Sequence, residues 1–115
     1  GFPALKGGEF LKQDINNLLK EYSINSVYEN WELILDYHFG GYAKVKPELI
    51  EFVRRFYISH NIKLDLIYTG KMLYGIYDLL KNTKQLDNQT IIAIHTGGIQ
   101  GNKGLEQRLR FTLFS

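Results

Sequence analysis

Leu66-Ile67-Tyr68-Thr69-Gly70-Lys71 and Ala93-Ile94-His95-Thr96-Gly97-Gly98 are the two stretches that decide the fold of this chain. Each ends an apolar, strand-like run with a hydroxyl side chain followed by glycine. In an open α/β sheet, ligands bind in the crevice at the carboxyl ends of the strands. We therefore expect the hydroxyls of Thr69 and Thr96, at the ends of neighbouring strands, to meet on one small molecule.

Outward from these stretches, the sequence predicts alternating helices and strands. Apolar spacing predicts helices over 8–22, 47–57 and 70–82, a short helical tail from Leu105, and strands over 31–37, 64–68 and 90–95. Pro47 followed by Glu48 suits a first helical turn. Gly40-Gly41 predicts a turn, and 82–89 a polar loop. This alternation favours an α/β fold, a three-layer open sheet, mostly parallel, with helices on both faces.

Composition narrows the classes of function. The chain has 115 residues, a formal charge of +2 and no cysteine. The charge is too small, and the basic residues too dispersed, to predict a nucleic-acid partner, and no apolar stretch is long enough to predict a membrane span. The absence of cysteine fits a reducing cytoplasm. The segment 1–5 resembles the end of a buried strand, so we expect 1–115 to be a single piece of a longer protein.

The strand-to-helix turn at Tyr68-Thr69-Gly70 allows two interpretations. Gly70 permits a tight turn, and the Thr69 hydroxyl is suited to capping the helix that follows. Alternatively, Tyr68 and Thr69 face a ligand. Lys71, in the first turn of that helix, is expected to face solvent. On the predicted helix, we expect the buried side to carry Met72, Leu73, Ile76, Tyr77 and Leu80.

The glycine-rich segment 95–104 has the context of a phosphate-binding loop but lacks the known signatures. Asn102 stands where a P-loop needs glycine, and no dinucleotide-binding glycine pattern is present. His95 is expected to be a hydrogen-bonded core histidine. His38, His60 and His95 lie far apart without carboxylates at ligand spacing, so no metal site is predicted.

Tyrosines near the middle of the chain are expected to be mostly core. Tyr37, Tyr42 and Tyr57 form this aromatic group. Tyr42 differs because it follows Gly40-Gly41 in a loop, where side chains often face a site.

Taken together, these segments resemble the last third of a pyridoxal-phosphate enzyme of the 1-aminocyclopropane-1-carboxylate deaminase and D-cysteine desulfhydrase family. The resemblance spans nearly the whole chain and is strongest over 66–75 and 94–101, while Gly40-Gly41-Tyr42-Ala43 matches the tyrosine loop of the family more loosely. It implies that this chain is part of a larger tryptophan-synthase-β-like fold.

The resemblance also implies roles for individual residues. Tyr68 and Tyr42 match residues beside the substrate, which are candidates for catalysis. Thr69 matches the residue that reaches the pyridine nitrogen of pyridoxal 5'-phosphate, and Thr96 with Gly97 matches positions close by. The lysine that forms the Schiff base, the serine that grips the substrate carboxylate and the phosphate loop match no residue of this chain. We therefore expect the chain alone to be inactive.

The threonine pair separates the relatives by activity. Cyclopropane-opening deaminases carry glutamate at the Thr69 position and leucine at the Thr96 position. A carboxylate holds the pyridine nitrogen protonated, whereas two hydroxyls leave a weaker electron sink that suffices for β-elimination.

The pair therefore predicts a D-cysteine desulfhydrase-like lyase or deaminase, converting a small D-amino acid to pyruvate, ammonia and sulfide. The complete enzyme is expected to be a homodimer. The alternatives are 1-aminocyclopropane-1-carboxylate deaminase and a non-catalytic α/β ligand-binding domain.

Overall fold

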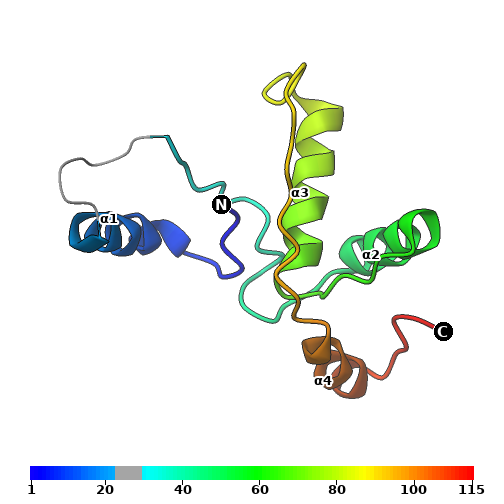
Figure 1. Ribbon diagram of the computed structural model, residues 1–115. Coiled ribbons are helices and arrows are strands. Elements are labelled where there is room, and N and C mark those ends of the chain that lie inside the picture. Colours follow the sequence, from blue (N-terminus) through cyan, green and yellow to red (C-terminus); the bar gives the residue numbers. More distant parts are fainter. Residues whose placement is uncertain (23–29) are drawn as a thin grey trace.

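The computed structural model describes residues 1–22 and 30–115, which contain four α-helices (Figure 1). In chain order, the elements are the 3₁₀ turn η1 (Gly8–Phe10), α1 (Leu11–Tyr22), α2 (Pro47–His60), α3 (Thr69–Asn82) and α4 (Gln100–Leu109). Helices α2 and α3 pack against each other, whereas α1 projects to one side and contacts η1 but no other described α-helix (Figure 1). The molecule is elongated, with extents of 50 × 33 × 22 Å.

The predicted helices are confirmed, with small changes at their ends. Pro47 occupies the first turn of α2, where its missing N–H is not needed, and Glu48 lies beside the positive end of the helix dipole. Asn61 ends α2 in the left-handed conformation, with its N–H donated to the carbonyl of Tyr57 at 2.7 Å. The tail predicted from Leu105 is the second half of α4.

The buried side of α3 differs in part from the prediction. Tyr77 and Leu80 are exposed, and the buried positions of the helix include Gly75 and Leu79. At Gly75, the helix backbone lies directly against the rings of Phe2 and Tyr37. Because the α3 backbone approaches these rings so closely at Gly75, the buried face of the helix is rotated by about one residue from the face that its large apolar side chains predicted.

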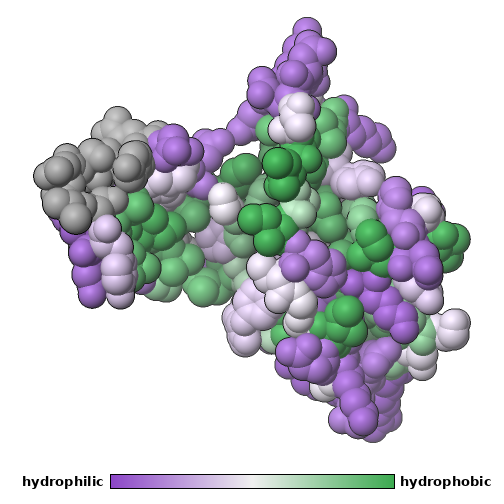
Figure 2. Space-filling model, viewed as in Figure 1, coloured by the Kyte–Doolittle hydropathy of each residue, from purple (hydrophilic) through white to green (hydrophobic). Residues whose placement is uncertain are grey.

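The buried core is small and lies where α2, α4 and the segment before α3 meet. It consists of leucines and one valine, namely Leu49, Val53, Leu64, Leu66, Leu105 and Leu113. In Figure 2, apolar residues also gather along α1 and over the base of α3, while the loop after α3 is hydrophilic. The chain therefore leaves much apolar surface outside its core, including Phe10, Leu18 and Tyr22 around α1.

The predicted three-layer sheet is absent from residues 1–22 and 30–115, which contain no β-strand. The segments predicted as strands, 31–37, 64–68 and 90–95, are extended or turn-like instead. A strand needs a neighbouring backbone to take up its N–H and C=O groups, and within the described residues no backbone hydrogen bond joins one of these segments to another. Extended backbone is confirmed for 90–95, whereas 66–68 form a turn, and the pairing of these segments into a sheet is not confirmed.

Side chains, rather than a neighbouring strand, satisfy the backbone hydrogen bonds of segment 64–68. The Asn102 side chain on α4 accepts the N–H of Leu66 at 2.9 Å and donates to the carbonyl of Leu64 at 3.0 Å. An amide side chain thus reproduces the donor and acceptor that a paired strand would offer. Beyond Leu66 the chain turns around Asp65 and enters α3 directly.

Segment 90–95 is extended and runs back along α3 (Figure 1). We predicted a strand buried on both faces, and this is wrong for the described residues, since Ile92 is 86% exposed and Ile94 71%. The apolar run has α3 on one side only and no covering layer on the other.

One contact has the geometry of a parallel strand pair. The amino group of Gly1 donates to the carbonyl of Glu32 at 2.7 Å, and the N–H of Ile34 donates to the carbonyl of Gly1 at 2.8 Å. This is the hydrogen-bond pattern of one parallel bridge opposite Leu33. Part of the expected parallel pairing is therefore present at a single position.

No helix in the described part of the chain is long and apolar enough to cross a membrane.

The first turn of α3 generates a stability prediction. A Cβ at Gly70 would collide with the backbone carbonyl of Asp65 and would lie 2.9 Å from a methyl of Val53. We expect Gly70→Ala to lower the free energy of unfolding by about 1–3 kcal/mol. Gly104→Ala, in α4 with nothing within 4 Å of the added Cβ, is the matched control and is expected to raise it by about 0.5–1 kcal/mol. Urea unfolding followed by circular dichroism measures both; equal effects would contradict this account.

Candidate functional site

The buried carboxylate of Asp65 organises the start of α3. One oxygen accepts the N–H groups of Ile67 at 2.8 Å and Tyr68 at 2.6 Å, and the other accepts the N–H of Thr69 at 2.8 Å. These donors are the otherwise unpaired N–H groups of a helix start, where negative charge is also favoured by the dipole. Asp65 therefore caps α3, a role that our sequence interpretation offered to Thr69.

Thr69 is 2% exposed, and its hydroxyl is tied to Asp65 in two ways. It donates to a carboxylate oxygen of Asp65 at 2.5 Å and accepts the backbone N–H of the same residue at 3.1 Å. Since the hydroxyl hydrogen is committed to Asp65, the group that remains is one lone pair on the oxygen. The Thr69 oxygen can therefore accept a hydrogen bond from a ligand but cannot donate one.

The hydroxyls of Tyr68 and Tyr42 lie 3.0 Å apart, although 26 positions separate the two residues in sequence. Their rings meet edge to face, with centroids 6.1 Å apart. The hydrogen bond with Tyr42, then partial burial and the charge of Asp65, raise the pKa of Tyr68 above its usual value. The two tyrosines that the sequence proposed for chemistry are thus brought together, and Tyr68 keeps its proton at neutral pH.

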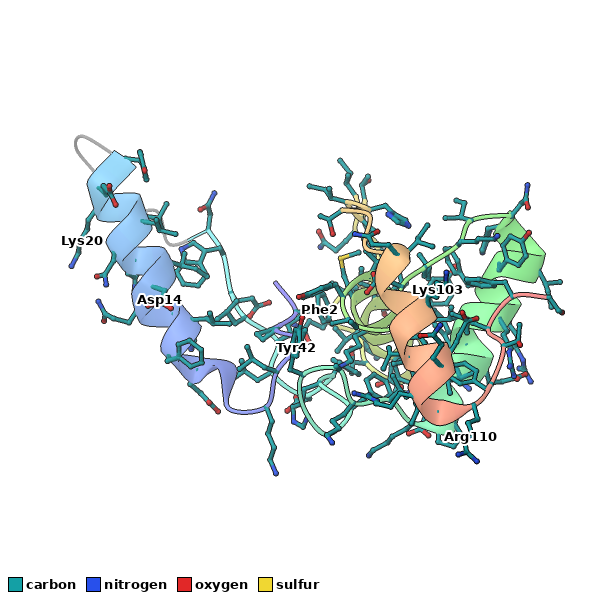
Figure 3. All side chains as sticks on the ribbon, turned by 90° about the horizontal axis from the view of Figure 1, so that it is seen from below. Phe2, Asp14, Lys20, Tyr42, Lys103 and Arg110 are labelled. Carbon is teal, nitrogen blue, oxygen red and sulfur yellow. The ribbon has the colours of Figure 1, made fainter. Side chains whose placement is uncertain are left out.

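A cavity of about 360 Å³ opens beside this pair. Its polar lining includes Tyr68, Thr69 and Thr96, and its apolar lining comes from α3, the N-terminal segment and the exposed extended segment, namely Phe2, Met72, Ile76, Ile92, Ala93 and Ile94. Figure 3 shows Tyr42 and Phe2 in the centre of the molecule, between α1 and α4. The volume and the mostly apolar walls suit a small, flat ligand.

His95 holds the turn that follows the extended segment. Its Nε2 donates to the carbonyl of Lys63 at 2.8 Å, and its Nδ1 accepts the N–H of Gly97 at 3.0 Å. This pairing requires a neutral imidazole with the hydrogen on Nε2. The prediction of a hydrogen-bonded histidine is confirmed, but His95 is exposed and does not belong to the core.

Gly97 and Gly98 both have positive φ, at 88° and 91°, and Gly98 lies against Asp65. A Cβ on Gly98 would lie 3.2 Å from the Asp65 carboxyl carbon, so a side chain there would press on the cap of α3. Gly97, in contrast, has open space around it. The structure thus brings the two strand-end stretches together at Asp65.

Lys71 is 1% exposed, which contradicts the prediction that it faces solvent. Its ammonium donates to three backbone carbonyls, those of Ala4 at 3.2 Å, His38 at 2.8 Å and Gly41 at 3.0 Å. Three hydrogens thus meet three acceptors, which allows the charge to be buried. Burial lowers the pKa of Lys71 to about 8, while the charge of Asp65 acts in the opposite direction.

The remaining tyrosines of the predicted aromatic group do not join this site. Tyr37 donates its hydroxyl to Asp78 at 2.8 Å and packs against Phe2, and Tyr57 packs against Phe114. Burial and the hydrogen bond to Asp78 raise the pKa of Tyr37 to about 12. Over 1–22 and 30–115, no group of three or more histidine or acidic residues is arranged to hold a metal ion.

Sequence reasoning missed Asp65, Lys71 and Asn102 as organisers of the site. Each is a buried polar residue. The partners of Lys71 and Asn102 are backbone groups distant in sequence, whereas those of Asp65 lie two to four residues further along the chain. A useful signal was the polar residue at position 65, placed between two leucines and four residues before Thr69. That spacing places a carboxylate where it can cap a helix start.

The tyrosine pair gives a prediction for titration. We expect Tyr42→Phe to lower the pKa of Tyr68 toward its usual value, because the largest cause of the shift is lost. A phenol whose pKa is raised on folding contributes stability below its unfolded pKa, and that contribution disappears as pH rises through the folded value. The variant should therefore lose less stability above about pH 10 than the parent chain.

Because the chain has eight tyrosines, nuclear magnetic resonance of tyrosine labelled at Cζ is used to follow this titration residue by residue. Tyr37 is the internal control, since its pKa of about 12 should not move in the variant. An unchanged Tyr68 titration in Tyr42→Phe would show that the two hydroxyls are not paired.

The relatives described below all carry deaminase names, and one of them is also named a desulfhydrase. The chain is 35% identical over 103 residues to a Pyrococcus horikoshii protein that carries the provisional name 1-aminocyclopropane-1-carboxylate deaminase; the match covers 88% of this chain and 31% of that protein. It is 40% identical over 62 residues to the bifunctional D-cysteine desulfhydrase/1-aminocyclopropane-1-carboxylate deaminase, mitochondrial, of Arabidopsis thaliana, covering 53% of this chain and 16% of the relative. A Thermotoga maritima protein, also provisionally named as a deaminase, is 30% identical over 91 residues, covering 79% of this chain and 28% of that protein.

No family model matches the chain, and no solved structure is significantly similar to it. The chain spans about a third of the length of the first of these relatives, as expected for a portion of such a protein. The resemblance seen in the sequence is confirmed: this chain is a relative, over nearly nine-tenths of its own length, of the 1-aminocyclopropane-1-carboxylate deaminase and D-cysteine desulfhydrase family.

Proposed function

We propose that this chain is the C-terminal portion of a pyridoxal-phosphate-dependent lyase that eliminates the β-substituent of a small D-amino acid, with D-cysteine as the model substrate. In this proposal, the chain supplies one side of the cofactor and substrate site. The observation that carries it is the convergence of Tyr68, Thr69 and Thr96 on one cavity, with Tyr42 hydrogen-bonded to Tyr68. The relatives' names agree with this class of chemistry.

The cavity suits the ring of the cofactor. Met72 and Ile76 offer apolar contact to a flat ring, and the free lone pair of Thr69 can accept a hydrogen bond from a ligand. Thr96, which also lines the cavity, adds a second hydroxyl. When bound, pyridoxal phosphate supplies an electron sink that stabilises negative charge at the substrate α-carbon.

The tyrosines supply proton chemistry in this proposal. Because its pKa is raised, Tyr68 is a proton donor at neutral pH. Tyr42 holds the Tyr68 hydroxyl at 3.0 Å and so restricts where that proton is delivered. The pair therefore suits protonation of a leaving group or of a product carbon.

Lys71 is not offered as the Schiff-base lysine, although it lies close to Thr69 in sequence. All three of its hydrogens are donated to backbone carbonyls, and the amine is buried. A nucleophilic amine needs a free lone pair and access to the carbonyl that it attacks. The resemblance to the family also places that lysine in a region that this chain does not match.

The threonine pair favours β-elimination over cyclopropane opening. Each of the two positions presents a neutral hydroxyl, and the carboxylate that contacts Thr69, that of Asp65, is engaged by the start of α3. A carboxylate that reached the ring nitrogen directly would strengthen the electron sink. Assembly as a homodimer and a cytoplasmic location stay predictions.

The first test is an assay of the complete open reading frame in which this chain occurs. We expect the purified protein to retain pyridoxal phosphate, seen by its visible absorbance, and to release pyruvate and sulfide from D-cysteine. Tyr68→Phe should reduce kcat about 10²–10⁴-fold, the range expected for loss of a general acid or base. Tyr57→Phe, which removes a hydroxyl outside the cavity, is the control. Failure of the complete protein to bind the cofactor would refute the proposal.

A second test asks whether the two threonines determine which substrate the complete protein prefers. In the complete protein, Thr69→Glu with Thr96→Leu should raise the ratio of 1-aminocyclopropane-1-carboxylate to D-cysteine turnover, since a carboxylate then faces the ring nitrogen. Thr90→Leu, at the other end of the same extended segment, should leave the ratio unchanged. An unaltered ratio in a double variant that still folds and binds cofactor would contradict the role of the threonine pair.

A further inference from the structure

The loop that carries Tyr42 has an unusual backbone. Phe39, Gly40, Gly41 and Ala43 all have positive φ, at 57°, 100°, 134° and 53°. Glycine adopts such angles easily, but Phe39 and Ala43 do so at a cost of about 1 kcal/mol or more each. A conformation of this kind persists only where surrounding contacts enforce it, so the loop must be held from outside.

Lys71 holds the loop from the side of α3. Its ammonium donates to the carbonyls of His38 and Gly41, which lie on either side of the two positive-φ residues Phe39 and Gly40. The same ammonium donates to Ala4, so it joins the N-terminal segment to the loop. The carbonyl of Gly41 also accepts the N–H of Lys44 at 3.1 Å. One buried charge thus fixes the backbone immediately before Tyr42.

Arg108 holds the loop from the other side. Its guanidinium, at the end of α4, donates to the carbonyl of Ala43 at 2.6 Å. Ala43 is the residue immediately after Tyr42 and is itself in the left-handed region. Lys71 on α3 and Arg108 on α4 therefore donate hydrogen bonds to the backbone carbonyls that flank Tyr42. Hydrogen bonds from charged donors are stronger than those between neutral groups.

We propose that Lys71 and Arg108 are positioning residues that hold the 38–43 loop so that the Tyr42 hydroxyl meets that of Tyr68. Neither residue is proposed to touch substrate or cofactor. The geometric part of the inference stands on this chain alone, and only its catalytic consequence rests on the proposed function.

Lysine suits this place because its ammonium has three donors that can point to three separate carbonyls. Methionine has a similar length and apolar stem but no hydrogen to donate, so Lys71→Met removes the three bonds with little change in volume. Lys81→Met, on the exposed last turn of the same helix, is the matched control.

The structural test measures the Tyr42–Tyr68 pair directly. In Lys71→Met we expect the pKa of Tyr68 to fall as far as in Tyr42→Phe, and the amides of Gly41 and Lys44 to exchange with solvent about tenfold faster or more. Lys81→Met should match the parent chain in both measurements. A Tyr68 titration and amide exchange that are unchanged in Lys71→Met would overturn the inference.

Two further variants guard against a folding defect. Arg108→Gln removes the hydrogen bond from the guanidinium to the carbonyl of Ala43 at the surface. It should accelerate exchange of the Lys44 amide without loss of helical circular dichroism. Lys71→Ala should regain the Tyr68 shift when propylammonium, which replaces the missing part of the side chain, is added. If Lys71→Met does not fold, the other two variants provide the test. The inference is refuted if Lys44 amide exchange is unchanged in Arg108→Gln and propylammonium does not restore the raised pKa of Tyr68 in Lys71→Ala.

Kinetics of the complete protein separate this inference from the proposed function. We expect Lys71→Met to lower kcat about as much as Tyr42→Phe, with KM changed less, and the effects of the two substitutions not to add. A protein without lyase activity whose Lys71→Met variant still loses the tyrosine pair would refute the proposed function and support the positioning role.

Discussion

The carboxylate of Asp65 is the interaction on which the described structure depends most. It accepts three backbone N–H groups and one hydroxyl at the start of α3, which is enough to bury its charge without loss of hydrogen bonds. The same carboxylate fixes the hydroxyl of Thr69, lies against Gly98 so that a Cβ there would press on it, and opposes the loss of the proton of Lys71. The start of α3, the hydroxyl of Thr69 and the turn at Gly98 thereby all contact one side chain.

The helices could be predicted from the sequence, but the connections between them could not. Local signals define a helix, as Pro47 and Glu48 show for α2, because its hydrogen bonds are made within the segment. A strand depends on a neighbour that the segment itself does not contain. The backbone of segment 64–68 is hydrogen-bonded by the side chain of Asn102, and segment 90–95 is paired with no other strand among the described residues. The predicted sheet is therefore not confirmed.

The sequence placed several candidate site residues near one another, although their roles stay a prediction, and it missed the residues that support them. Tyr68, Thr69 and Thr96 do line one cavity, and Tyr42 does lie beside Tyr68. Lys71 was placed on the wrong side of the helix surface, because a lysine in a first turn normally stays in water. Its burial follows from three carbonyls supplied by segments 30 and more positions away, and no local pattern contains that information.

The uncovered segment 90–95 has a consequence for the behaviour of this chain in concentrated solution. Ile92 and Ile94 are exposed on an extended backbone that presents open donors and acceptors to any similar segment. A short apolar run without proline or charge is the kind of sequence that stacks in register with copies of itself. Handled by itself, the chain is therefore prone to assemble edge to edge into aggregates, and a charge at position 92 would act as a gatekeeper against that assembly.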